Sequence, residues 1–466
     1  MHSIDQVLVL DKEIGLEKLT LRRCPPLELK HLLMLTSLKT LIVESSHALV
    51  GPVGGGQGDM EWKLPIEHIR IRDLNGNSGE ELTELLPHLP KLSKLEICFC
   101  KNIKKLVVGV DVQQTTSEAS EMGGGEIRPV AEEEDEEDEL TASEEEEMEE
   151  CGITAAEEEH DEEDEITTSE ASEAEEDETT ATAEEEDDGV LFFPAHLCDS
   201  LQELELTHCT ELVLVDPPTL VPGEGWLQAL RSLQRLTIQW SPKFLSAFTS
   251  SRHVFPSSLQ YLKLVGVEGM GTLEPLSNLS SLTTLELQDC GEDLECQGLQ
   301  SLLTTGGQLK CLDPLDDTEG GEEQQKQLVS STLQELCTDD AAGLLSVPVC
   351  SFFSSALTKL ELYGWDYKGM ECFSREQENS LQILSHLQEL KFSWFDDLQR
   401  LPAGLRNLTT LKKLSIYGCP AVSSLPNDGL PESLQELYVG YNCSQELKQQ
   451  CRGLEGTIPE IRIVDW

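Results

Sequence analysis

One short pattern of apolar and polar positions recurs along the 466-residue chain. Each copy begins with Leu or Ile and has an apolar residue at its fourth position; all but one have an apolar residue at the sixth, and many have Cys at the ninth. The clearest copy is LKKLSIYGC, from Leu411 to Cys419. Most copies begin 22 to 32 residues after the one before. The thirteen copies begin at Leu16, Leu38, Ile66, Leu92, Leu201, Leu233, Leu259, Leu282, Leu333, Leu357, Leu387, Leu411 and Leu434.

The alternation inside each copy predicts a short strand. In Leu204, Glu205 and Leu206, for example, apolar and polar side chains alternate with a period of two, so one face of the strand is buried. One such strand buries too little to be stable alone, whereas stacked copies build a continuous core under a parallel sheet. The spacing and frame are those of leucine-rich repeats. We therefore predict an α/β solenoid, a leucine-rich repeat horseshoe with a curved parallel β-sheet and an irregular convex side.

The ninth position explains part of the cysteine content. We expect its side chain to hydrogen-bond backbone groups that the turn after the strand leaves unpaired. The 15 cysteines are an odd number and contain no Cys-x2-Cys pair, which favours reduced core thiols over a disulfide framework or a zinc site. We expect neither a metal nor a cofactor. The ninth residues that fit are Cys24, Cys100, Cys209, Cys290, Cys419 and, in the last copy, Asn442.

Some copies are weak or lie at the end of the pattern. Thr338 occupies a position where a buried apolar residue is expected. The 51-residue gap after Leu282 suggests a degraded copy around Leu309 and Leu312. After the thirteenth copy, the segment beginning at Ile458 predicts one more strand, and Trp466 could cover the end of the core.

A strongly acidic segment interrupts the repeats. Residues 111–190 contain 37 of the 88 acidic residues and one basic residue, Arg128. Such a segment repels itself and cannot bury enough apolar surface to fold. We predict N-terminal repeats over 1–110, a disordered acidic insertion over 111–189 and C-terminal repeats over 190–466. The insertion is either a solvated spacer or a decoy that holds a basic surface.

Several kinds of chemistry lack their sequence motifs. The phosphate-binding motif G-x-x-x-x-G-K-[ST] is absent, as are G-x-S-x-G and H-E-x-x-H, so we do not expect an enzyme. A signal peptide and a membrane span are not predicted, because no apolar stretch approaches about 20 residues. The formal charge of −55 disfavours nucleic acid as a partner. We expect a cytoplasmic or nucleo-cytoplasmic protein.

The predicted strands offer a binding face. Positions three, five, seven and eight point away from the core and would line the concave side of the sheet. Seven of the 12 Trp and Tyr residues fall there, either because aromatic residues favour strands or because they form a recognition surface. Three lysines in the same positions would add a mildly cationic rim. The candidate residues are Trp240, Tyr261, Tyr363, Trp394, Tyr417, Tyr438 and Tyr441, with Lys359, Lys391 and Lys413.

The C-terminal stretch from Leu401 to Arg452 resembles a known family. Its unit LPAGLRNLTTLKKLSIYGCP and its ending LPESLQEL resemble the C-terminal repeats of plant intracellular immune receptors of the coiled-coil, nucleotide-binding, leucine-rich-repeat class, especially those of grasses. The resemblance covers residues 1–110 and 190–466. It implies a receptor arm that recognises a pathogen effector or a guarded host protein and restrains a nucleotide switch.

The chain departs from that family in one respect. The nucleotide-binding module with its phosphate loop and the N-terminal coiled coil are not in the sequence. The resemblance therefore implies either a piece of a receptor or a free repeat protein, and a receptor's nucleotide-binding domain is a further possible partner. The alternative is an acidic leucine-rich-repeat chaperone or regulator of basic partner proteins. In those proteins, however, the acidic tract follows the repeats. The ligand and the oligomeric state stay open.

Overall fold

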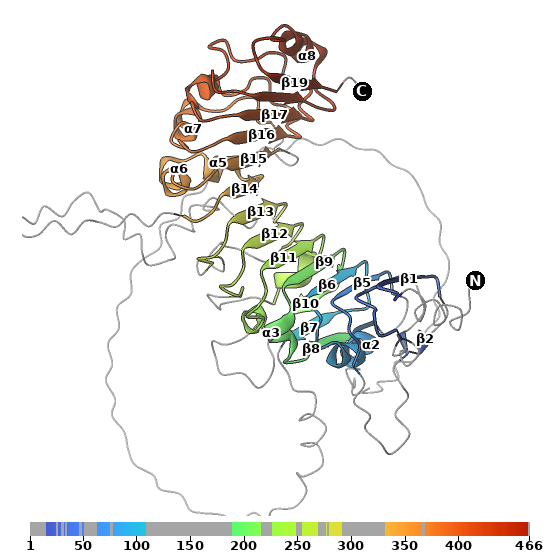
Figure 1. Ribbon diagram of the computed structural model, residues 1–466. Helices are drawn as coiled ribbons and strands as arrows, with labels where there is room; N and C mark the ends of the chain where they lie inside the picture. The colour runs from blue at the N-terminus through green and yellow to red at the C-terminus, as the bar shows by residue number, and fades with distance from the viewer. Residues whose placement is uncertain are drawn as a thin grey trace, which may run out of the picture. The chain divides into compact units, whose positions relative to one another are not determined.

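The computed structural model describes residues 15–24, 27–28, 32, 35–45, 49–50, 63–74, 78–108, 189–215, 226–247, 254–268, 276, 279–290, 331–364 and 369–464. They contain one parallel sheet of fourteen strands whose order in space is their order along the chain (Figure 1). Each predicted copy, including the one at Ile458, supplies one strand. The strands are β1 (Lys18–Arg22), β3 (Thr40–Glu44), β5 (His68–Arg72), β6 (Lys94–Cys98), β9 (Glu203–Thr207), β11 (Arg235–Gln239), β12 (Tyr261–Val265), β13 (Thr284–Gln288), β14 (Glu335–Thr338), β15 (Lys359–Tyr363), β16 (Glu389–Ser393), β17 (Lys413–Tyr417), β18 (Glu436–Val439) and β19 (Glu460–Ile463). The fold is a leucine-rich-repeat solenoid, as predicted.

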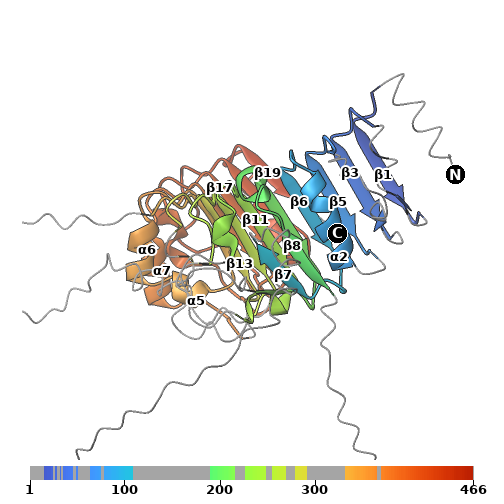
Figure 2. The same ribbon diagram turned by 90° about the horizontal axis from the view of Figure 1, so that it is seen from below.

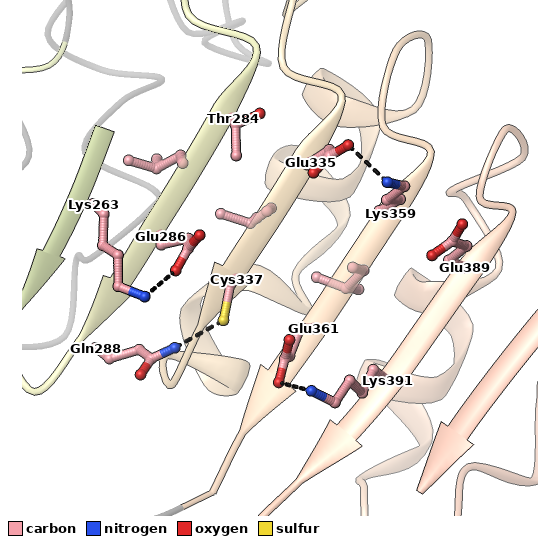
Figure 3. A pocket seen from close by; sticks show the side chains of 13 residues that line it. Lys263, Thr284, Glu286, Gln288, Glu335, Cys337, Lys359, Glu361, Glu389 and Lys391 are labelled. Atoms are coloured by element: carbon pink, nitrogen blue, oxygen red, sulfur yellow. Dashed lines mark hydrogen bonds and ion pairs between the residues drawn. The ribbon is translucent and has the colours of Figure 1, made fainter. Parts of the chain in front are cut away.

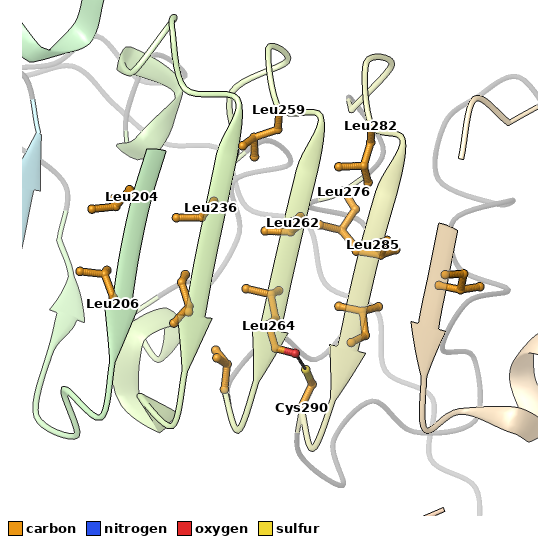
Figure 4. Packing of buried hydrophobic residues seen from close by; sticks show 14 of the residues in the cluster. Leu204, Leu206, Leu236, Leu259, Leu262, Leu264, Leu276, Leu282, Leu285 and Cys290 are labelled. Carbon is orange, nitrogen blue, oxygen red and sulfur yellow. Dashed lines mark hydrogen bonds between the residues drawn. The ribbon is translucent and has the colours of Figure 1, made fainter. Parts of the chain in front are cut away.

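The apolar positions of the repeat set the register of the sheet. Leu390 of β16 pairs with Leu414 of β17, and two residues further Phe392 pairs with Ile416. Equivalent positions stack in the same way along the sheet, and Figure 4 shows these rows of leucine side chains in β9, β11, β12 and β13. Nearly all of them are fully buried. A slip of one residue would turn every such side chain to the opposite face, so the pattern fixes the pairing.

Side chains at the ninth position bond to the backbone in the turn after the strand. The Sγ of Cys419 donates to the carbonyl of Tyr417 at 3.3 Å, and Cys290 makes the same contact with Gln288 at 3.5 Å. Ser241 fills this position after β11, where its Oγ accepts from the N–H of Cys209 at 3.1 Å. The predicted role of this position is therefore confirmed.

The last copy corrects one assignment of the ninth position. Asn442 is exposed and has a φ of 53°, whereas Cys443 is buried and donates to the carbonyl of Tyr441. The prediction of Asn442 was wrong because the loop after β18 is one residue longer than in the other copies. Cys443 occupies the place that Cys419 has in the preceding copy, and both thiols also point at a backbone carbonyl of the strand before.

The long gap in the repeats has no strand of its own in the main sheet. β13 pairs directly with β14, with Leu285 opposite Leu336, so no strand lies between them. The predicted degraded copy around Leu309 and Leu312 lies outside the described residues and stays a prediction. Thr338 is buried as its position requires, and its Oγ1 accepts a hydrogen bond from the N–H of Asp340 at 3.0 Å.

Among the described residues, the helices and turns between the strands are short and vary from one repeat to the next. Figure 2 shows α5, α6 and α7 gathered at one side of the strand ladder. The short helices are α2 (Ser78–Leu85), α3 (Leu197–Ser200), α5 (Ala341–Leu344), α6 (Val347–Phe353), α7 (Arg375–Leu381) and α8 (Gln445–Arg452), and the 3-10 turns are η2 (Leu86–His88), η4 (Trp226–Ala229), η5 (Pro242–Leu245) and η7 (Ala403–Asn407). Two small sheets contain β2 (Leu27–Glu28) with β4 (Leu49–Val50), and β7 (Lys105–Val108) with β8 (Val190–Phe193) and β10 (Val213–Leu214).

The main sheet is continuous across the place of the acidic segment. β6 pairs directly with β9, with Leu95 opposite Leu204. The repeats on both sides therefore share one sheet and one apolar core. Residues 109–188, which include almost all of the predicted insertion, and Trp466 lie outside the described residues.

Candidate protein-binding surface

The seven candidate aromatic residues occupy two kinds of backbone. Four are in strands: Tyr261 in β12, Tyr363 in β15, Tyr417 in β17 and Tyr438 in β18. Three are in the turns that follow β11, β16 and β18: Trp240, Trp394 and Tyr441. The sequence pattern placed position eight on the face of the sheet. In the structure this position belongs to the turn at the edge of the sheet. The strand preference of aromatic residues does not account for the side chains in these turns.

Position eight closes the strand with a left-handed backbone conformation. Trp240 has a φ of 52° and Trp394 a φ of 60°. Each N–H donates to a carbonyl of the next strand, that of Val265 at 2.7 Å and that of Tyr417 at 2.8 Å. A residue other than glycine in this conformation costs about 1–2 kcal/mol. Left-handed residues other than glycine recur at position eight in Arg23, Ser45, Asp73, Phe99, His208, Trp240, Asp289 and Trp394, whereas in the longer loop after β18 the left-handed residue is Asn442, at position nine.

Three of the predicted residues form one group of rings, here called the aromatic cluster: Trp394, Tyr417 and Tyr441. The ring centroids of Trp394 and Tyr417 are 5.1 Å apart in an edge-to-face arrangement. Tyr441 lies 6.5 Å from Trp394 and 6.4 Å from Tyr417. Tyr441 is 50% exposed, and the other two are half-buried. The Lys391 ammonium lies 6.0 Å from the centre of the Tyr417 ring, within the range of a cation–π interaction.

Glycines of the following repeat leave room for the rings of the aromatic cluster. A Cβ added to Gly418 would lie 2.8 Å from Cε3 of Trp394, and one added to Gly440 would collide with Tyr417. Gly418 also has a φ of 64°, which glycine adopts without strain. The sequence therefore places a flat ring in one copy over a glycine in the next.

The other candidate tyrosines lie outside this group of three rings. The Tyr261 hydroxyl donates to Oε1 of Glu286 at 2.7 Å, and the Arg235 guanidinium lies 4.2 Å from the centre of its ring. Burial and the Glu286 carboxylate raise the pKa of Tyr261. Tyr363 and Tyr438 are half-buried on the outward face of β15 and β18.

The three candidate lysines each pair with a glutamate of a neighbouring strand. Their Nζ atoms lie 2.8 to 3.3 Å from carboxylate oxygens. These pairs cancel the charge of the lysines, so the predicted cationic rim does not exist as a net positive surface. The pairs are Lys359 with Glu335, Lys391 with Glu361 and Lys413 with Glu436.

A hollow of about 340 Å³ lies on the outward face between β12 and β16 (Figure 3). Cys337 of β14 forms part of its lining, and its small side chain leaves space between the longer side chains of β13 and β15. The amide of Gln288 donates to Sγ of Cys337 at 2.9 Å, and burial raises the pKa of this thiol to about 12. Ion pairs line the rest of the hollow, so its surface is polar with nearly balanced charge.

The sequence missed a second group of rings at the same edge of the sheet. Phe99 stacks on His208 with ring centroids 4.3 Å apart and planes 9° apart, and Trp240 lies 6.3 Å from His208. The guanidinium of Arg72 lies 5.0 Å from the centre of the Phe99 ring. All three rings occupy position eight of successive copies, so the repeat frame could have identified them had Phe and His been counted with Trp and Tyr.

Part of the chain is similar in sequence to a plant disease resistance protein. No family model matches the chain. A 200-residue stretch, 39% of the chain, is 29% identical to "Disease resistance protein RPS4B" of Arabidopsis thaliana. That stretch spans 16% of the length of the Arabidopsis protein.

Two solved structures of leucine-rich-repeat proteins are similar to the chain. A leucine-rich-repeat protein of Leptospira interrogans is 13% identical with a TM-score of 0.31, covering 100% of this chain and 99% of its own. The leucine-rich-repeat domain of the type III effector XopL is 14% identical with a TM-score of 0.23, covering 96% and 82%. Because both TM-scores are low, the fold assignment rests on the repeat pattern and the strand order of this chain.

Two other kinds of site were sought in the part of the chain that the structure describes. There, no group of three or more His, Cys, Asp or Glu side chains is arranged to hold a metal ion. Nor does any helix in those ranges have the length and apolar character needed to cross a membrane.

Proposed function

We propose that this chain is the protein-recognition module of a plant intracellular immune receptor. Its partner would be a pathogen effector, a guarded host protein or the nucleotide-binding domain of a receptor, met in the cytoplasm. The observation that carries the proposal is the aromatic cluster of Trp394, Tyr417 and Tyr441 at the C-terminal edge of the sheet. The resemblance of Leu401–Arg452 to immune receptors supports the biological setting.

The aromatic cluster has the properties of a binding hot spot. Trp and Tyr dominate the residues whose loss weakens protein complexes most, and such residues gather in groups. Trp394 keeps a left-handed backbone that would favour glycine. Tyr441 is half exposed to solvent. Strain and exposed apolar area both cost stability or solubility, so a partner surface gives a reason for their presence.

A binding experiment with two serine variants tests this proposal. The full chain is used in a two-hybrid screen against plant and pathogen proteins, and the affinity of any purified partner is then measured. Trp394→Ser or Tyr417→Ser should weaken binding by about 30-fold, the equivalent of about 2 kcal/mol. Their melting temperatures should change little, since neither ring fills the apolar core.

Val347→Ser provides the matched control. Val347 is 58% exposed on α6, so it is an apolar surface residue away from the sheet edge. This variant should bind as the wild type does. Partners that tolerate both aromatic variants but are lost with Val347→Ser would overturn the assignment of the site.

A further inference from the structure

The outward face at the N-terminal end of the sheet is positively charged. At positions three, five, seven and eight of β1, β3, β5 and β6 there are three acidic residues, Glu44, Asp73 and Glu96. The same positions hold six cationic residues: Lys18, Arg22, Arg23, Arg70, Arg72 and Lys94. The surplus of three positive charges is unusual in a chain with a formal charge of −55. We call this surface the basic face.

The basic face differs from the other end of the same sheet. Among the described residues at the same positions of β14 to β19, seven are acidic and four are cationic. The charge along the sheet therefore changes sign. Cations that only neutralised the many acidic residues of the chain would be spread among those residues. Placing them together on four adjacent strands is unfavourable, because like charges side by side repel one another.

A buried carboxylate organises the centre of the basic face. Glu96 is 1% exposed and accepts from Nε2 of His68 at 3.0 Å, from Nζ of Lys94 at 3.2 Å and from the Arg70 guanidinium. Burial alone would raise the pKa of Glu96, but these three hydrogen bonds lower it to about 2. The carboxylate thus stays charged and holds the surrounding cations in place, and Lys94 also pairs with Glu203 of the adjacent β9 at 2.9 Å.

An apolar feature borders the basic face. Phe99 is 37% exposed, and the guanidinium of Arg72 lies over its ring. A hollow of about 540 Å³ opens beside it, and its lining includes Phe99, Leu74, the cations Arg72 and Lys101 and the acids Glu44 and Asp73. The hollow therefore offers an exposed ring within a lining of balanced charge, and it could take an apolar side chain of a segment whose acidic residues lie on the basic face.

We propose that the basic face binds an acidic segment of a partner protein, with an apolar side chain of that segment in the hollow beside Phe99. Four strands about 4.8 Å apart span about 14 Å, the length of four to five extended residues. A short acidic peptide matches this size and charge. Nucleic acid does not, because its charge continues beyond this length and the sheet becomes acidic towards its other end.

The test measures binding of a fluorescent peptide to the full chain. The probe is a ten-residue peptide of alternating Glu and Asp with Leu at its centre, and its fluorescence anisotropy is recorded at 50 mM and 300 mM salt. Binding should weaken several-fold at the higher salt, because exposed charge pairs are screened. A peptide with Gln and Asn in place of the acids should bind at least tenfold more weakly. Equal binding of the two peptides, or no binding of either, would overturn the proposal.

Variants locate the site on the sheet. Arg72→Gln and Lys18→Gln should each weaken the acidic probe about fivefold, since each removes one cation from the basic face. Arg462→Gln removes the same charge from β19, whose Arg462 already pairs with Glu460, and should leave binding unchanged. Thermal melting checks that all variants fold. An equal loss with Arg462→Gln would mean that the probe senses only net charge, which contradicts the proposal.

A further variant tests the apolar part of the site. Phe99→Ser should weaken the probe with the central Leu about fivefold but leave a probe with Gly at its centre unchanged. Equal effects on both probes would exclude the hollow as part of the site. Sedimentation of the chain alone tests whether a second copy of the chain occupies the basic face. If the chain forms a dimer and Arg72→Gln dissociates it, the occupant is a second copy and the proposal of a partner protein is wrong. Trp394→Ser should bind the acidic probe normally, which separates this site from the aromatic cluster.

Discussion

Leu414 and Lys413 are neighbours in β17, but they face opposite sides of the sheet. Leu414 is fully buried, whereas the half-buried Lys413 pairs with Glu436 at 3.3 Å. Leu414→Ala should lower the free energy of unfolding by about 2–5 kcal/mol, because it leaves a cavity in the core. Lys413→Ala should cost at most about 1 kcal/mol, the range of an exposed ion pair. Urea unfolding of the two variants checks this, and equal losses would refute the strand assignment.

Glu96 gives a prediction about pH. Its folded pKa of about 2 lies below the ordinary value of 4.5, so its contribution to stability is complete above about pH 4.5. As the pH falls towards 2, the proton binds the unfolded chain first and this contribution is lost. Glu96→Gln should therefore cost on the order of 3 kcal/mol at pH 7.

The readout for Glu96 is the difference between wild type and variant, since many other carboxylates titrate over the same range. Thermal or urea unfolding at pH 7, 4 and 3 should show the two free energies of unfolding converging as the pH falls. A constant difference over this range would show that the ion pairs of Glu96 do not produce the effect.

Single residues also show what a sequence can and cannot predict here. The buried face of each strand and the bonding role of the ninth cysteine follow directly from the repeat. The pairing of Glu96 with Arg70 does not, because it depends on which strands are adjacent and in what register. Likewise, an extra residue in the loop after β18 moved Cys443 into the place predicted for Asn442. Such a loop insertion leaves no mark in the alternation of the strand.

The turns after the strands place an aromatic ring of one repeat over a glycine of the next repeat. Trp240 packs over Gly266 as Trp394 packs over Gly418, and in both cases a Cβ on the glycine would come within 2.8 Å of the indole. These two tryptophan–glycine contacts lie in different parts of the same sheet and are formed by the same positions of the repeat. The arrangement was not predictable, because Trp gives no hint of a left-handed backbone at its own position.

Gly418→Ala tests the seat of Trp394. The new methyl group should displace the indole and strain a backbone with a φ of 64°. We expect a loss of roughly 1 kcal/mol or more in the free energy of unfolding, together with a change in tryptophan fluorescence and weaker partner binding. Near-ultraviolet circular dichroism and fluorescence of the folded protein measure the displacement.

Gly429→Ala is the matched control for this variant. Gly429 also has a positive φ, of 85°, but a Cβ there would meet nothing within 4 Å. It should lose stability through backbone strain alone, with unchanged fluorescence and binding. Identical spectra for the two variants would contradict the proposed seat of the indole.

The whole molecule combines one sheet with two chemically different ends. The basic face lies on β1, β3, β5 and β6, and the aromatic cluster lies on β16 to β18 and the turns after them. The two surfaces are at least seven strands apart within one continuous ladder, so they could engage separate partners. This separation was only half predictable: the C-terminal aromatic residues follow from the repeat frame, whereas the net charge of a face requires the strand order.

The acidic segment interrupts the repeats along the chain but does not interrupt the main sheet. We propose the domain boundaries 1–110, 111–189 and 190–466. Direct pairing of β6 with β9, and of β7 with β8, holds the repeats together on both sides. The apolar residues of the described core on either side of the segment form one cluster. The segment should therefore contribute little to the free energy of unfolding of the repeats.

Replacing residues 111–186 with a Gly/Ser linker tests this expectation. The linker needs about twelve residues, because β7 and β8 are parallel and it must return along the length of a strand. Closing a loop of about 12 rather than about 80 residues reduces the entropic cost of folding by about 1–2 kcal/mol. The melting temperature should hence stay the same or rise slightly. A fall of several degrees, with β7 and β8 losing their protection in hydrogen exchange, would mean that the acidic segment helps to fold the repeats.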